Sequence, residues 1–329
     1  MSTVVEATAE VGAGGARGRR WVPVAGLVLR RFALLLVLLM LVFAAISLLP
    51  GDAARAALGR DAAPETIAAK RHELGLDQPL PQRFWSWLSG LATGDFGTTV
   101  HGRSIADLLA GSAPQTLLLG GLAFALTVIA SLGCGMWWAA RPSGWAARVL
   151  QPATAMVVAL PEFVVAAVLI MVFSFAAGWF PAVTVAGRSG FPADASMLVL
   201  PVLALAVPQT GWNTRVVRSA LADAARAPHV ENAELEGISP RHLMVRHVLP
   251  VALPAIAASY ATTVGMLLGG ALVVESLFNY PGLGALLAGS VADRDTALAA
   301  ATAAVAGATI LCVLLLADGL RGWAMRGRR

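Results

Sequence analysis

Long apolar runs are the feature of this sequence that most constrains its fold. An α-helix needs about 20 mostly apolar residues to cross the hydrocarbon core of a bilayer, which is about 30 Å thick. Runs that reach or come close to this length lie at 32–49, 116–139, 153–175, 197–211, 251–274 and 297–317. Because lipid offers no hydrogen-bond partners, a spanning segment must satisfy its own backbone, as a helix does. We therefore expect an all-α integral membrane protein with six transmembrane helices.

Composition favours a polytopic membrane protein and excludes a soluble globular one. Apolar residues make up 57% of the 329 positions, charged residues make up 13%, and the mean hydropathy is +0.73. The fourth run is the weakest, since Pro201 and Pro208 interrupt it, but spanning helices tolerate proline. The first run follows Arg30 and Arg31 and has no small-residue cleavage site before Pro50, so we expect a retained anchor.

The distribution of basic residues predicts the orientation. Most of the 24 Lys and Arg residues fall in segments on the same side as the N-terminus, and most of the others lie in one long segment that also carries acids. Short loops rich in Lys and Arg stay in the cytoplasm. We therefore expect both termini inside, with a disordered cytoplasmic tail and the start of the first helix at 1–31. The first span at 32–49 then leads to an extracytoplasmic segment at 50–114 and a helical core at 115–329, whose inner loop is 215–250.

The extracytoplasmic segment carries two helical patterns. The first runs from Pro64 to Leu74 and stops at Gly75. The second, at 82–91, is expected to bury Phe84, Trp85, Trp87 and Leu88. These patterns indicate a small helical cap on the outer face. The alternative is a packed loop that only connects two spans, since aromatic residues are also common at membrane interfaces.

The inner loop has the capping chemistry of two short helices. Pro228 suits a helix first turn, and Gly237 can take the left-handed conformation that ends a helix. Ser239 is then expected to cap a second helix that begins at Pro240. Such an element is stiff and exposed, as a lever that contacts a cytoplasmic partner must be. The alternative is a solvated loop, which would not require caps at both ends.

This loop resembles the EAA loop of ABC importer membrane subunits. Glu231, Ala233 and Gly237 match its start and its glycine, and Leu249 with Pro250 matches its Leu-Pro ending. The rest of the chain from about residue 29 is similar to the dipeptide/oligopeptide/nickel permease family. The matching segments are Leu-Pro-Gly-Asp at 49–52, Leu-Gly-Leu-Asp-Gln-Pro-Leu at 74–80, Gly-Asp-Phe-Gly-Thr at 94–98, Pro-Glu-Phe at 161–163, Arg215 and Arg218, and Glu275 followed by Pro-Gly-Leu-Gly at 281–284. The first three resemble the first of the two permeases that such systems pair.

The resemblance implies a bacterial inner-membrane subunit with six helices and four further kinds of contact. These are a homologous second permease, two cytoplasmic ATPases, an extracytoplasmic solute-binding protein and the bilayer. The cargo would be a peptide or a related solute such as a nickel chelate, glutathione or an opine. One departure concerns the ATPase contact, because Glu234-Leu235-Glu236 stands where the family commonly has Arg-Ala-Lys.

Candidate pathway residues follow from the cost of charge in lipid. Glu162, between Pro161 and Phe163, is the one ionisable residue well inside an apolar run. An acidic side chain at the bilayer centre costs about 2.5–3.5 kcal/mol on insertion scales, so it should face the bundle interior. There it either lines the cargo path or partners a neighbouring helix. Glu275, at the outer end of the fifth run, is expected to be a structural or gate residue.

Catalysis and metal binding are not expected from this chain. A phosphate-binding Walker A loop needs a Lys beside Gly, and the single lysine, Lys70, lies in a different context, so ATP and Mg²⁺ are expected on partner ATPases only. Cys134 and Cys312 have no further ligand at metal-binding spacing. A secondary transporter or an intramembrane enzyme remains the alternative, although no His-Glu-x-x-His motif is present and every histidine falls outside the apolar runs.

Overall fold

The computed structural model describes residues 21–48, 53–59, 62–187 and 190–326. Within these residues the chain is helical, with two isolated β-bridges and no strand, which confirms the expected all-α class. Its long helices are α1 (Trp21–Ser47), α5 (Ile105–Ala140), α8 (Ser196–Ala225), α11 (Leu249–Leu277) and α13 (Thr296–Arg326). The expected N-terminal tail and the Leu-Pro-Gly-Asp segment at 49–52 lie outside the described residues.

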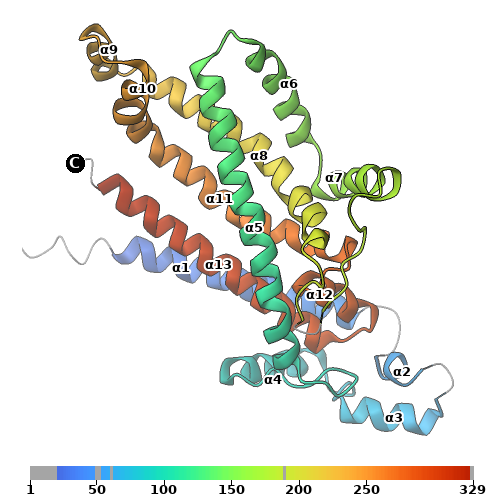
Figure 1. Ribbon diagram of the computed structural model, residues 1–329. Helices are drawn as coiled ribbons and strands as arrows, with labels where there is room; N and C mark the ends of the chain where they lie inside the picture. The colour runs from blue at the N-terminus through green and yellow to red at the C-terminus, as the bar shows by residue number, and fades with distance from the viewer. Residues whose placement is uncertain (1–20, 49–52, 60–61, 188–189, 327–329) are drawn as a thin grey trace, which may run out of the picture.

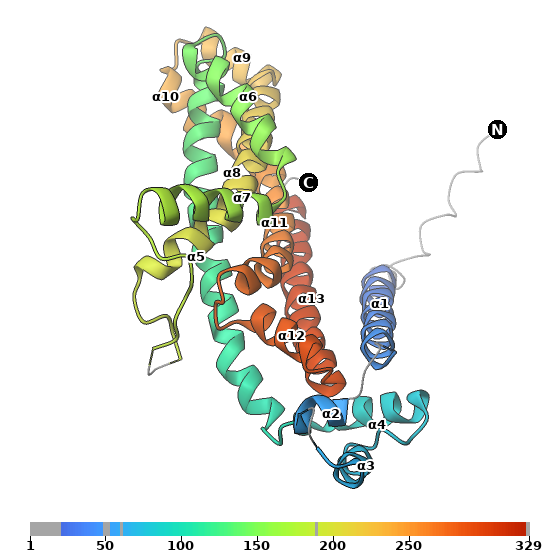
Figure 2. The same ribbon diagram turned by 90° about the vertical axis from the view of Figure 1, so that its right-hand side faces the viewer.

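The long helices form one bundle in which each packs against at least one other. α5, α8 and α11 pack against one another, α13 packs on α11, and α1 packs on α13 (Figures 1 and 2). The main core joins Leu119 of α5, Leu205 of α8 and Leu267 of α11, all fully or almost fully buried. Four short helices lie at the two ends of this bundle, with α9 (Pro228–Leu235) and α10 (Pro240–Leu243) at one end and α3 (Pro64–Glu73) and α4 (Leu80–Thr93) at the other. We call these the α9 end and the α4 end.

Four helical segments are long and apolar enough to cross a membrane. They are Leu29–Ser47, Ile105–Ala140, Pro240–Leu277 and Thr296–Leu315. A fifth span results if the bent pair Ala147–Ala159 and Glu162–Ala176 counts as one. α8 does not meet the same criterion, although it runs unbroken through Pro201 and Pro208. The structure therefore supports four or five spans by length and composition.

The run at 153–175, expected as one span, is not a straight helix. The chain breaks at Leu160 and Pro161 between α6 (Trp145–Ala159) and α7 (Glu162–Leu169), and the two halves are bent by 107°. Leu160 is extended, with φ −91° and ψ 126°, because a residue that precedes proline is sterically disfavoured in the helical region. α7 then continues as a π-helix, η2 (Ile170–Ala176).

The α4 end contains three short helices, α2 (Ala53–Leu58), α3 (Pro64–Glu73) and α4 (Leu80–Thr93). Gly75 follows α3 with φ +64°, as expected for a stop signal. Phe84 is buried against Phe43 of α1, with ring centroids 5.5 Å apart. The expected burial of Trp85 is wrong, since 65% of its surface is exposed. Trp87 and Leu88 share the face of Phe84 at helical spacing, whereas Trp85 points away from it.

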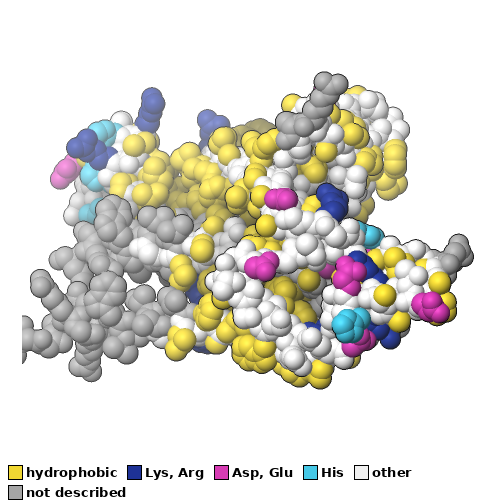
Figure 3. Space-filling model, turned by 90° about the horizontal axis from the view of Figure 1, so that it is seen from below, with side chains coloured by type: hydrophobic (Ala, Val, Ile, Leu, Met, Phe, Trp, Pro, Cys, Tyr) yellow, Lys and Arg dark blue, Asp and Glu magenta, His cyan; other side chains and the backbone are white. Residues whose placement is uncertain are grey.

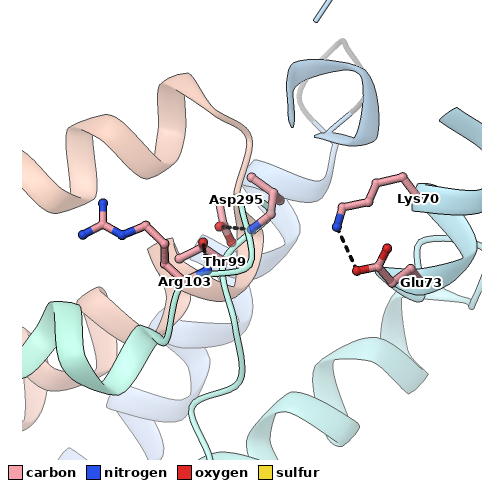
Figure 4. Close-up of polar contacts among 6 residues, drawn as sticks. Lys70, Glu73, Thr99, Arg103 and Asp295 are labelled. Carbon is pink, nitrogen blue, oxygen red and sulfur yellow. Dashed lines mark hydrogen bonds and ion pairs between the residues drawn. The ribbon is translucent and has the colours of Figure 1, made fainter. Parts of the chain in front are cut away.

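A loop connects these short helices to α5 and meets the far end of the chain. The backbone N–H of Val100 donates to Oδ2 of Asp295 at 2.7 Å, and the backbone N–H of Arg103 donates to the Thr99 hydroxyl at 3.1 Å (Figure 4). Lys70 and Glu73 form a separate ion pair within α3, 2.8 Å long. Seen from the α4 end, charged and histidine side chains lie among hydrophobic ones (Figure 3). The segment is thus fastened to the bundle by contacts distant in sequence.

Candidate functional site

The loop at the α9 end has the helix, glycine turn and helix that the sequence predicts. α9 (Pro228–Leu235) begins with Pro228 at its first position. Gly237 then adopts φ +80°, the left-handed region that favours glycine. Its N–H donates to the carbonyl of Glu234 at 3.0 Å, and the N–H of Ile238 donates to the carbonyl of Ala233 at 3.3 Å. These two bonds close the end of α9 into a rigid turn.

The second helix of the loop differs from the expectation in two ways. Ser239 precedes α10 (Pro240–Leu243) in an extended conformation, but its side chain makes no capping hydrogen bond. The helix also does not end inside the loop. It continues through a π-helical turn, η3 (Met244–Val248), directly into α11. The loop is therefore joined through continuous helix to a membrane-spanning segment.

α9 has one anchored face and one free face. Val230 and Ala233 are buried, and Val230 packs in a cluster with Leu221 of α8 and Val248 of η3. Leu249 is partly buried against the same cluster, and Pro250 is exposed. Glu231, Glu234 and Leu235 of α9 are exposed, as is Glu236 directly after the helix, and 81% of the surface of Leu235 is accessible; we call these four residues the free face of α9. These exposed side chains are available to another protein.

Glu162 begins α7 directly after the break in the chain. Pro161 is its N-cap and is exposed, and Phe163 is 52% exposed. Glu162 itself is half-buried against α11, since a Cβ built on Gly270 would lie 3.5 Å from its carboxyl carbon. Within the described part of the chain its carboxylate has no hydrogen bond or ion pair. The structure thus places an acid at a helix N-terminus, where negative charge is favourable, on the flank of a spanning helix.

Glu275 is enclosed by protein near the other end of α11. It is fully buried, and its Oε2 accepts a hydrogen bond from the backbone N–H of Gly284 at 2.6 Å. Gly282 lies against the same carboxylate, where a side chain would collide with it. The Pro-Gly-Leu-Gly segment is thus the turn that brings α12 (Leu283–Ala292) back onto α11. The surroundings of Glu275 are those of a structural residue.

A buried polar network that was not predicted from the sequence joins α8 and α11. Asn213 is fully buried and donates from Nδ2 to the Thr263 hydroxyl at 2.8 Å, while its Oδ1 accepts from the Ser259 hydroxyl at 2.8 Å. Between α5 and α11, the Ser131 and Tyr260 hydroxyls are 2.8 Å apart. Hydrogen bonds of this kind hold helices together in lipid. The sequence signal for this network was Asn213, an amide residue close behind the apolar run at 197–211.

Comparisons with known proteins agree with this arrangement. Residues 131–329 match the family described as "Binding-protein-dependent transport system inner membrane component", and residues 25–112 match the N-terminal family of the same membrane components. The glutathione transport system permease protein GsiC of Pectobacterium atrosepticum is 33% identical over 288 residues, which cover 87% of this chain and 92% of that protein. GsiC of Escherichia coli is 33% identical over 262 residues, or 79% of this chain and 83% of that protein.

A solved structure extends the likeness to the fold. An inward-facing form of the MetNI methionine ABC transporter aligns with a TM-score of 0.55 at 16% identity, over 66% of this chain and 96% of that chain. At this low sequence identity the match is evidence of a shared fold and of nothing more. Neither a secondary transporter nor an intramembrane enzyme is supported by these matches. The chain therefore belongs to the binding-protein-dependent ABC importer permeases of the dipeptide, oligopeptide and nickel group, as a multi-pass translocation subunit of the bacterial inner membrane.

Proposed function

We propose that this chain forms half of a peptide translocation pathway and that α9 couples it to ATP hydrolysis on separate subunits. The observation that carries the proposal is the free face of α9, with its three acids and exposed Leu235, on an element that continues into α11. The complex would contain a homologous second permease, two cytoplasmic ATPases that hold ATP and Mg²⁺, and an extracytoplasmic solute-binding protein. No cofactor or metal would be bound by this chain.

The proposed topology has six spans, with both termini and the α9 end in the cytoplasm. α8 would be the fourth span. Its Asn213 finds partners on α11 and its Thr214 and Gln209 are buried, so lipid need not solvate these groups. The arginines of 215–250 would then lie on the cytoplasmic side, and the helices α2, α3 and α4 would face the solute-binding protein.

Coupling would proceed through the packing of α9 on α8 and η3. Because Val230, Leu221 and Val248 share one buried cluster, a displacement of α9 must move the ends of both α8 and α11 or separate the cluster. Protein interiors are close-packed, so the first outcome is favoured. An ATPase that holds the free face of α9 could thereby tilt two spanning helices together.

The cargo would be a peptide or a similar small solute. The relatives at 33% identity are named as glutathione permeases. Glu162 would offer a negative site to the amino group of a peptide or to a metal-bearing cargo, with Pro161 and Phe163 beside it at the break. Glu275 would keep the α11–α12 turn in place at the other end of the pathway.

Uptake by reconstituted complex tests the proposal. Proteoliposomes should contain this permease, its partner permease and both ATPases, with ATP inside and the solute-binding protein with labelled glutathione, dipeptides or nickel chelates outside. We expect accumulation of at least one of these solutes that requires both ATP and the binding protein. Accumulation driven by an ion gradient without ATP would contradict the proposal.

A further inference from the structure

A cavity that two arginines line lies between three helices toward the α9 end of the bundle. Its volume is about 520 Å³, and it is open on one side. The walls come from the last turns of α5, from α6 and from the C-terminal half of α8. The side chains that line it include Trp138, Gln151, Trp212, Arg215, Arg218 and Ser219. This cavity is distinct from α9 and from the surroundings of Glu162.

The charged groups that line the cavity are basic. Arg215 and Arg218 line it, and no acidic residue does. Within the described part of the chain neither guanidinium has a hydrogen bond or an ion pair to a protein group. Arg218 is held over the ring of Trp138, with its Cζ 5.1 Å from the ring centroid. Guanidinium groups bind phosphate oxygens through paired N–H donors, so two unpaired ones beside a cavity favour a phosphate group.

An apolar groove next to the cavity indicates what kind of molecule carries the anion. The groove, of about 280 Å³, runs between the same three helices and contains Cys134, Leu150, Val157 and Leu203. On α8 the residues that line the groove run from Leu203 to Thr214, and those that line the cavity run from Trp212 to Ser219. The two linings therefore overlap along the helix. A charged head with an apolar extension toward the middle of the bundle fits a phospholipid and does not fit a small soluble anion.

The position of the cavity agrees with a lipid headgroup. Trp212 is 48% exposed and lies directly after the apolar part of α8, and Trp145 at the start of α6 is 67% exposed. Tryptophan is enriched at the level of lipid headgroups. Basic pockets between spanning helices on the cytoplasmic side bind anionic headgroups.

We propose that this cavity binds the phosphate of an anionic phospholipid from the inner leaflet, with one acyl chain in the adjoining groove. Arg215 and Arg218 hold the phosphate, and the side-chain amide of Gln151 supplies a further donor. Occupancy ties α8 to α5 and α6 at the base of the segment that leads into α9. The lipid thus steadies the helix from which the coupling loop extends.

Native mass spectrometry of the purified importer complex provides the test. The complex is extracted from nanodiscs of phosphatidylcholine with phosphatidylglycerol, and retained phosphatidylglycerol is counted. Arg215→Gln and Arg218→Gln should each lower its retention about fivefold, the factor that corresponds to one basic residue near an anionic membrane. Arg226→Gln is the matched control, because Arg226 is an exposed arginine at the end of α8 outside the cavity. This variant should retain the lipid as wild type does.

Two further arms separate the sources of the anion. Ala153→Phe, which fills the groove, should also release phosphatidylglycerol while both arginines remain. Inorganic phosphate should not displace the lipid. Unchanged retention in the arginine variants, or equal loss in Arg226→Gln, would overturn the proposal. Displacement by inorganic phosphate or by a transported peptide would assign the arginines to a soluble anion or to cargo instead, and would overturn it equally.

Discussion

The carboxylate of Glu275 and the backbone N–H of Gly284 are joined by a 2.6 Å hydrogen bond inside the protein, nine residues apart. The two helices α11 and α12 approach so closely here that a Cβ on Gly284 would overlap the backbone of Leu272. Glycine is thus required at this position by close contact. The buried acid supplies the acceptor that the first turn of α12 would otherwise lack.

Gly284→Ala should therefore destabilise the permease. Overpacking of this kind costs about 1–3 kcal/mol, so the melting temperature of the purified complex should fall. Gly289→Ala is the matched control, since Gly289 lies in the same helix and a Cβ there meets nothing within 4 Å. That control should leave stability unchanged or raise it slightly. Equal stability of both variants would contradict the account of the turn.

Sequence patterns predicted the helical class, the glycine turn of the inner loop and the two helices at 64–74 and 82–91, because these depend on local chemistry. The 107° bend at Leu160 was not predicted, because a proline in an apolar run is compatible with a helix that is only loosened as well as with one that bends sharply. Tertiary contacts of the two halves decide how far the helix bends at this proline. The exposure of Trp85 could have been predicted from helical spacing, since it lies outside the face formed by Phe84, Trp87 and Leu88.

The partners of buried polar residues could not be predicted from the chain alone. Asn213 meets Ser259 and Thr263 only because α8 and α11 cross at that height, and the Val100–Asp295 contact joins positions 195 residues apart. The acids of the inner loop were identified, but their exposure depends on which face of α9 the cluster around Val230 covers. The other subunits of the complex were predicted from the family resemblance, because the pattern of a single chain does not identify them.

Asp295 should make stability depend on pH. It is buried and accepts backbone hydrogen bonds from Val100 at 2.7 Å and Leu298 at 3.0 Å. Burial raises the pKa of Asp295 above its ordinary value of 3.8, against the opposing effect of the two hydrogen bonds. Because the folded state binds this proton more readily than the unfolded chain, the contribution to stability is present below pH 3.8 and is lost as pH rises through the raised pKa.

Asp295→Asn removes this titration. The melting temperature of the variant complex should therefore change less with pH over that window than that of wild type. It should also be lower throughout, because an amide keeps one acceptor oxygen where the carboxylate has two, and lost helix caps cost about 0.5–2 kcal/mol. Asp77→Asn, at an exposed acid distant from Asp295 in the sequence, serves as the control. Parallel pH curves for wild type and Asp295→Asn would rule out this role.

Glu162→Gln distinguishes a pathway acid from a structural one. The substitution keeps size and hydrogen bonding and removes the charge. We expect normal assembly and reduced uptake of cargo that carries a free amino group, as measured in proteoliposomes. Glu65→Gln is the control, since Glu65 occupies the first turn of α3 in the same way but is exposed at the α4 end. Wild-type uptake by Glu162→Gln across pH, with failed assembly of Glu162→Ala, would establish the structural role.

Reversal of Glu234 and Glu236 to Lys should weaken the association with the ATPase. Both side chains are exposed on the free face of α9, so they are available to basic groups of a partner. The loss should be greater at low salt, because exposed charges are screened over a Debye length of about 10 Å at 0.1 M. The amount of ATPase that co-purifies with the permease at two salt concentrations measures this loss of association. Glu65 and Asp77, both exposed at the opposite end, provide a double Lys control that should bind normally.

The central claim is that the rigid turn at Gly237 transmits ATPase motion to the spanning helices, and the ratio of solute taken up to ATP hydrolysed tests it most directly. Gly237 has φ +80°, where a β-branched side chain is strained by about 1–2 kcal/mol although the space is open. Gly237→Val should insert and assemble normally but lower the ratio, whereas Gly237→Asn, which tolerates this conformation, should keep it near that of wild type. An unchanged ratio in Gly237→Val would contradict the claim.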